Sequence, residues 1–139
     1  MRPHDDRGRT ATRRAPFENP RGVSAIRRSG QYAYVIVRFG GSASGGEEVR
    51  VFAHLADAGI SLNLLKLFPG GMAFVVEEGD SSETAEIIRR LEHEASVVPS
   101  VAMVCIEAAN MRGMHGVMNR IAAALLAERI EIYQVGDAP

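Results

Sequence analysis

The feature that most constrains the fold is a strand-loop-helix-strand pattern that the chain contains twice. In the first copy, residues 34–37 form an apolar run rich in the β-branched and aromatic residues that favour strands. Residues 51–55 then show the apolar spacing of one helical face, and residues 60–64 alternate as in a second strand. The two copies align without a gap: Gly46, Arg50, Leu55 and Ile60 match Gly116, Arg120, Leu125 and Ile130. The repetition predicts one structural unit that is used twice.

The order of the elements predicts an α+β fold of the ferredoxin-like type. Turn residues, capping residues and apolar periodicity indicate a short strand at 23–26, then strand 32–39, helix 47–58, strands 60–67 and 72–77, a helix after Asp80, and strand 101–107. From strand 32–39 onward this order is β-α-β-β-α-β, the split βαβ arrangement. A partial second unit, β-α-β, follows from residue 101.

The second unit is shorter than the first. It has no counterpart of the third strand or of the second helix, so strand 130–135 has no obvious neighbour within its own unit. Each backbone polar group that is buried without a partner costs roughly 1–3 kcal/mol. We therefore expect residues 130–139 to be frayed or paired with another chain.

The charge of the chain is unevenly distributed. The net charge is -1 in 139 residues, but eight arginines and only three acidic residues fall within residues 1–30, so the remainder is acidic. An acidic body does not favour phosphate backbones. Residues 1–20 contain prolines, arginines and almost no periodic apolar residues, which predicts a flexible basic tail. A nucleic-acid or acidic-partner arm is the less favoured interpretation of that tail.

The single cysteine and the apolar runs bear on the compartment. Cys105 lies among valine, methionine and isoleucine, so we expect a buried core residue and no intrachain disulfide. The arginine-rich N-terminus lacks the apolar core of a signal peptide. No apolar run approaches the ~20 residues needed to cross a bilayer. These features predict a cytoplasmic protein without a membrane partner.

The glycine-rich loop at residues 40–46 is the leading candidate for a binding site. Glycines allow a close approach of the backbone to a ligand, and N–H groups at a helix start attract anions. The loop lacks the Lys-Ser/Thr pair of a P-loop and the spacing of a dinucleotide site. Glu47 and Glu48 would repel a phosphate but suit a ligand that carries both charges, such as a free amino acid. The alternative is a flexible connection with two solvated glutamates.

Other classes of function find little support in the residues. The four histidines, at positions 4, 54, 93 and 115, lack metal-ligand spacing, and no catalytic constellation is present, so we expect no metal, no cofactor and no enzymatic activity. Residues 70–77 loosely resemble the stacking strand of RNA-recognition modules. Met72 and Glu77 replace the aromatic residues that stack bases, so nucleic-acid binding is not expected.

Three segments resemble the regulatory region of aspartokinases. Residues 18–26, ENPRGVSAI, are similar to the junction at which the kinase domain leads into paired ACT domains. Residues 56–62, ADAGISL, match the helix end and second strand of the first ACT domain. Residues 108–117, AANMRGMHGV, resemble the start of the second ACT domain. The resemblance covers about residues 17–137.

This resemblance implies a domain division and a set of site residues. Residues 21–29 would complete the sheet of the second ACT domain, residues 30–100 would form the first ACT domain, and residues 101–139 a partial second one. Effectors of such modules, lysine, threonine or diaminopimelate, bind at the loop-helix starts across an interface between chains. The implied effector contacts are Ser44, Gly45, Gly46, Glu47, Glu48 and Asn63, with a second-domain loop at Met114, His115, Gly116 and Val117.

The expected function is therefore a non-catalytic, amino-acid-binding regulatory protein of aspartate-family biosynthesis. It would act as a homodimer through its ACT domains, or on an aspartokinase catalytic chain. The alternative is a structural or interaction protein, or a gene fragment, whose effector site has decayed and which pairs with an aspartokinase chain or with itself. No kinase motif is present in the chain.

Overall fold

The fold is built on one four-stranded antiparallel sheet, seen in a computed structural model that describes residues 22–40, 45–109 and 116–136. The predicted basic tail lies outside these residues. The strands are β1 (Gly22–Arg38), β2 (Asn63–Phe68), β3 (Gly71–Glu77) and β4 (Glu94–Ala109), in the order β2-β3-β1-β4. The helices are α1 (Glu47–Asp57), α2 (Ser81–Arg90) and α3 (Val117–Ala127), with a short 3-10 turn η1 (Glu78–Asp80) before α2. The predicted α+β, ferredoxin-like class is confirmed.

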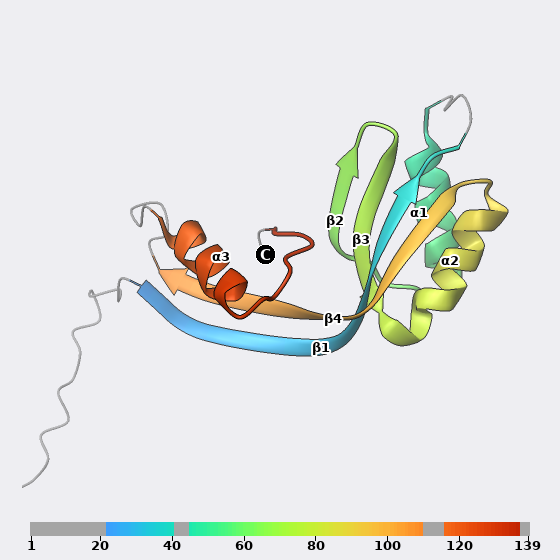
Figure 1. The fold of residues 1–139 in the computed structure, drawn as a ribbon. Coiled ribbons are helices and arrows are strands. Elements are labelled where there is room, and N and C mark those ends of the chain that lie inside the picture. The colour runs from blue at the N-terminus through green and yellow to red at the C-terminus, as the bar shows by residue number, and fades with distance from the viewer. Residues whose placement is uncertain (1–21, 41–44, 110–115, 137–139) are drawn as a thin grey trace, which may run out of the picture.

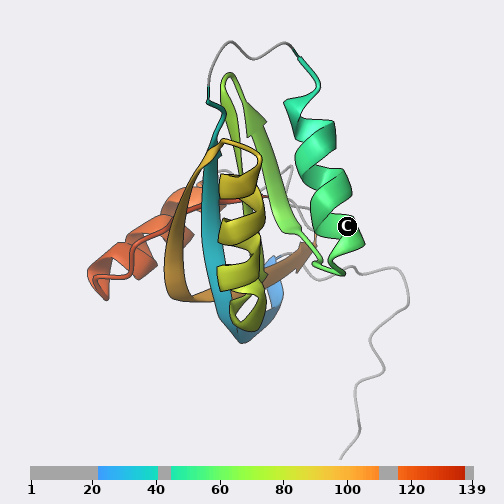
Figure 2. The ribbon, with the colours of Figure 1, turned by 90° about the vertical axis from the view of Figure 1, so that its right-hand side faces the viewer.

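The first unit consists of α1 and α2 packed on one face of this sheet (Figure 1, Figure 2). Alternate residues of each strand point to opposite faces. On β3, Met72, Phe74 and Val76 face the helices and are fully buried, whereas Ala73 and Val75 belong to a second apolar cluster on the other face. The main core therefore lies between the sheet and the α1–α2 layer.

Strands β1 and β4 continue beyond the first unit as a long two-stranded ribbon (Figure 1). In the ribbon, residues 22–29 of β1 pair with residues 103–109 of β4. Between the two parts the pairing shifts register near Ser29 and Tyr32, and both Gln31 (φ 68) and Ser100 (φ 56) are left-handed. The proposed domain limits at 29/30 and 100/101 fall in this junction, and the division itself stays a prediction.

The internal repeat appears as a repeated set of backbone hydrogen bonds. Gly46 and Gly116, both left-handed with φ 83 and φ 80, precede α1 and α3. The helix starts and ends repeat in detail: Arg50 N–H donates to Gly46 O and Arg120 N–H to Gly116 O, and Ile60 N–H donates to Leu55 O and Ile130 N–H to Leu125 O. The second unit thus reproduces the loop-helix geometry of the first.

The C-terminal segment departs from the prediction. Residues 130–136 form neither strand nor helix, so the last strand of the predicted β-α-β unit is not formed. The segment lies on the face of the first sheet that carries no helix (Figure 1). Tyr133 packs on Tyr34 with 5.6 Å between ring centroids, and Gln134 Nε2 donates a hydrogen bond to Leu64 O. The described part of this segment therefore packs on the first unit of its own chain, and pairing with another chain stays a prediction.

The second unit exposes much of its apolar surface. Val117 is the buried residue of α3, and Leu126 on the same helix is 74% exposed. Cys105 is exposed, so the prediction of a buried cysteine was wrong. The ribbon has only two strands here, and the described residues supply no further strand to make a second layer over them. Exposed large apolar side chains of this unit include Val23, Ile26, Val104, Met118, Ile130, Ile132 and Val135.

Candidate functional site

The start of α1 has the properties expected of a small-anion site. Gly45 and Gly46 both have positive φ, 82 and 83, a backbone conformation that glycine adopts without steric cost. Gly46 at the N-cap has no side chain that could accept from the first-turn N–H groups. Ser44, the other predicted loop contact, lies outside the described residues.

His93 was not among the site residues predicted from the sequence, yet it joins the two flanks of the glycine loop. The Gly40 N–H donates to His93 Nδ1 at 3.2 Å, and His93 Nε2 lies 3.1 Å from Glu47 Oε2. Because Nδ1 accepts, this network assigns the ring proton to Nε2, which donates to the carboxylate. The His93 side chain is only 3% exposed.

The two glutamates at the start of α1 have different surroundings. The Glu47 side chain is 14% exposed, and its carboxylate contacts His93 and lies 3.7 Å from the guanidinium of Arg50, so it is already occupied. Glu48 is half-buried, and within the described residues no ion pair involves it. Of the two carboxylates, Glu47 is thus the one that has charged partners among the described residues.

Asn63 is not brought beside the loop within the same chain. It pairs with Val75 on β3, whereas the loop leaves β1 near Arg38, which pairs with Gly71. Gly71 and Val75 are four positions apart on β3, which is roughly 13 Å along the strand at the usual rise per residue. Any ligand shared by Asn63 and the start of α1 would have to extend over that distance or involve a second chain.

The second predicted loop is described only in part. Gly116 is left-handed and precedes α3, and Val117 is 8% exposed, so its side chain is part of the packing of α3. Met114 and His115 lie outside the described residues. The backbone of Gly116 thus resembles that of Gly46, but no glutamate follows it.

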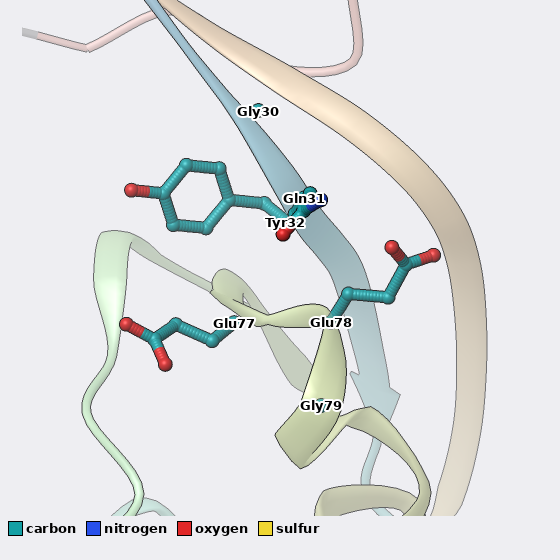
Figure 3. Close-up of a pocket in the computed structure, with 6 residues that line it drawn as sticks. All are labelled: Gly30, Gln31, Tyr32, Glu77, Glu78 and Gly79. Atoms are coloured by element: carbon teal, nitrogen blue, oxygen red, sulfur yellow. The ribbon is translucent and has the colours of Figure 1, made fainter.

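A separate open cavity of about 550 Å³ lies at the junction of the two units (Figure 3). On its wall Glu78 points toward β4, where the backbone N–H and the hydroxyl of Ser100 both donate to Glu78 Oε1 at 3.0 Å. This contact connects η1 to the left-handed residue of β4. The cavity is lined by Gly30, Gln31, Tyr32, Glu77, Glu78 and Gly79, so it is distinct from the loop site.

Two further properties concern the described residues as a whole. None of their helices combines the length and the apolar character that a membrane crossing requires. Their histidine, cysteine and acidic side chains form no cluster of three or more that could hold a metal ion.

Comparison with known proteins places this fold among aspartate kinases. No protein-family model matches the chain. Aspartokinase 1 of Bacillus subtilis is 30% identical over 92 residues, which are 66% of this chain and 22% of that protein. The chain therefore spans about a fifth of the length of this curated relative.

Solved structures with the same fold include separate regulatory chains. The ligand-free regulatory subunit of aspartate kinase from Thermus thermophilus superposes with a TM-score of 0.69 at 21% identity, over 84% of this chain and 81% of that chain. Aspartokinase III of E. coli, in complex with lysine and aspartate, superposes with a TM-score of 0.62 at 19% identity. The superposition covers 87% of this chain and 28% of that chain. The resemblance to the regulatory region of aspartokinases, which was predicted from the sequence, is confirmed. The chain thus resembles aspartokinase in sequence and has the fold of the regulatory part of aspartate kinase.

Proposed function

We propose that this chain is a non-catalytic regulatory protein that binds a free amino acid of the aspartate family at the start of α1. The observation that carries the proposal is the position of Glu48 in the first turn of a helix that follows two left-handed glycines. An α-carboxylate is stabilised at a helix N-terminus by the N–H groups and the helix dipole. Its ammonium group could then approach Glu48.

The proposed contacts are those implied by the aspartokinase resemblance. They comprise Ser44, Gly45, Gly46, Glu47, Glu48 and Asn63, with Glu47 acting through its place in the His93 network rather than as a free carboxylate. Lysine, threonine and diaminopimelate are the candidate effectors. The lysine and aspartate complex of E. coli aspartokinase III supports testing amino acids of this family.

The partner in this proposal is a second copy of the chain or an aspartokinase catalytic chain in the cytoplasm. Support comes from the exposed apolar side chains of the second unit, such as Leu126 at 74% and Ile26 at 66%. Contiguous exposed apolar surface is typical of interaction sites. The relative from Thermus thermophilus is itself a regulatory subunit.

Thermal unfolding in the presence of each amino acid tests the binding proposal. A ligand at one hundred times its dissociation constant should stabilise the native state by about 2.7 kcal/mol. Glu48→Gln should remove the shift for a cationic effector. Glu83→Gln is the matched control, because Glu83 is an exposed glutamate in the first turn of α2. The absence of a shift with lysine, threonine and diaminopimelate at millimolar concentration would contradict amino-acid sensing.

The alternative is a structural or interaction protein, including a gene fragment, with a decayed effector site. The exposed apolar surface of the second unit favours it without any need for a ligand. Under this alternative the protein would associate with itself or with an aspartokinase chain, and amino acids would change neither the association nor the stability. Sedimentation with and without lysine separates the two functions.

A further inference from the structure

We propose that His93 is the positioning residue of the candidate effector site, because it holds both flanks of the glycine loop at once. The expected effect of His93 on ligand affinity rests on the proposed function. The connection of Gly40 to Glu47 by one buried imidazole does not, because it concerns the protein without ligand. His93 comes from the turn between α2 and β4, so an element remote in the sequence connects the two flanks, Gly40 and Glu47.

The imidazole is held rigidly in its place. The His93 backbone N–H donates to Ile88 O at the end of α2, and its ring meets the edge of Phe39 with 5.0 Å between centroids. Phe39 N–H in turn donates to Gly70 O at 2.8 Å. Aromatic contacts of this edge type favour one ring orientation. Both ring nitrogens therefore point in fixed directions.

The first flank of the loop approaches this turn too closely for any side chain. A Cβ added at Gly40 would lie 2.5 Å from the backbone oxygen of Glu92, which cannot move away as a flexible side chain could. Glycine at position 40 is thus explained by close approach rather than by its φ angle. The approach brings the Gly40 N–H within hydrogen-bonding distance of His93 Nδ1.

The second flank is fixed through a side chain of α1. Glu47 lies one and two turns before Val51 and Leu55, which are 0% and 1% exposed, so the three residues share the inward face of the helix. The bond from His93 Nε2–H to Glu47 holds the first turn of α1 against the α2–β4 turn. The direction of the first-turn N–H groups, on which a ligand carboxylate would depend, is set by this contact.

Loss of either bond should lower ligand affinity by reducing the population of the competent loop. The apparent dissociation constant rises in inverse proportion to the fraction of molecules in the competent conformation. If the loss of one hydrogen bond leaves a tenth of the molecules competent, the affinity falls about tenfold.

Two conservative substitutions separate the bonds. An asparagine amide can replace Nδ1, and a glutamine amide can replace Nε2, because their side chains reach different distances. His93→Asn should keep the acceptor for Gly40 and lose the contact with Glu47, whereas His93→Gln should do the reverse. His54→Gln is the matched control, because His54 is an exposed histidine on α1 whose Nδ1 contacts the backbone oxygen of Arg50.

Amide hydrogen exchange of the ligand-free protein gives the first test. The Gly40 amide should exchange about tenfold faster in His93→Gln than in the native protein, and close to the native rate in His93→Asn and His54→Gln. The Phe74 amide in β3 reports in each variant whether the core is folded. Unchanged exchange of Gly40 in a folded His93→Gln protein would overturn the proposal.

Calorimetric titration with lysine, threonine and diaminopimelate gives the second test. Both His93 variants should bind the effector about tenfold more weakly than the native protein, and His54→Gln should bind normally. If both His93 variants bind the effector as tightly as His54→Gln and the native protein do, His93 has no role in binding. If the native protein binds none of these amino acids, the proposed function fails, and the Gly40 exchange alone then decides whether His93 fixes the loop.

Discussion

The contact between Tyr133 and Tyr34 offers a quantitative test of the unexpected path of the C-terminal segment. Tyr133 is 43% exposed, so rather more than half of its side chain is buried. Full burial of a large apolar side chain is worth ~1.5–3 kcal/mol, which scales here to about 1–2 kcal/mol. The aromatic pair, at 5.6 Å between centroids, adds ~0.5–1.5 kcal/mol. Tyr133→Ala should therefore lower the free energy of unfolding by about 2 kcal/mol.

The assay is urea denaturation followed by far-ultraviolet circular dichroism, because the chain has no tryptophan. A double-mutant cycle with Tyr34→Val should give a coupling energy of about 1 kcal/mol if the two rings stack within one chain. Tyr133→Phe is the matched control. It removes only a hydroxyl whose bond, to Glu131 at 3.3 Å, is exposed, so stability should change little.

Two results would refute this reasoning. If the effects of Tyr133→Ala and Tyr34→Val add to within about 0.3 kcal/mol, the rings do not interact. If the effect of Tyr133→Ala depends on protein concentration, the tyrosine packs on a second chain instead.

Three further predictions follow from other contacts. Gly71→Ala should lower the free energy of unfolding by about 2 kcal/mol, and with it the melting temperature, because the added Cβ would lie 2.2 Å from the backbone oxygen of Val37. An unchanged melting temperature would show that β1 and β3 can separate there. Glu78→Ala should speed amide exchange at Ser100 about tenfold, whereas Glu78→Gln should retain much of the protection. Burial raises the pKa of the Tyr34 hydroxyl above its ordinary value of 10.0, so the folded state holds this proton more tightly than the unfolded state. The resulting stability is present below about pH 10 and is lost as the pH rises through the pKa of Tyr34 in the folded state. Tyr34→Phe should abolish this loss, which urea denaturation at a series of pH values between about 8 and 11 would measure.

Much of the first unit could be predicted because its signals are local. The alternation at 72–76 and the apolar spacing of 51–55 place residues on one face of a strand or helix whatever the neighbours are. The repeated glycines were informative for the same reason. Gly46 and Gly116 have nearly equal φ angles, so a residue type correctly indicated a backbone conformation.

The errors in the second unit have a common physical cause. Ile130 and Ile132 alternate as strand residues do, but a strand forms only beside a partner, and no partner strand is available to them among the described residues. Cys105 has an apolar sequence context, yet it is exposed because no element of the described part of the chain covers the ribbon there. A local sequence pattern indicates which side chains could be buried. It does not indicate whether another element of the fold is present to pack over them.

The role of His93 could not have been predicted from neighbouring residues. Its two partners, Gly40 and Glu47, lie 53 and 46 positions away in the sequence. Spacing rules for histidine apply to metal ligands and helix faces, whereas this contact exists only after the α2–β4 turn has docked against the loop.

The continuous ribbon of β1 and β4 has a consequence for the order of folding. Its far end pairs Gly22 with Ala109, residues so distant in the sequence that closing them directly would be entropically costly. Once the first unit has formed, Arg38 and Glu94 are already paired, and each further pair along the ribbon extends an existing ladder by one step. The second unit should therefore assemble by zippering outward from the first and unravel from its free end. On this expectation the first unit is the template on which the second one folds.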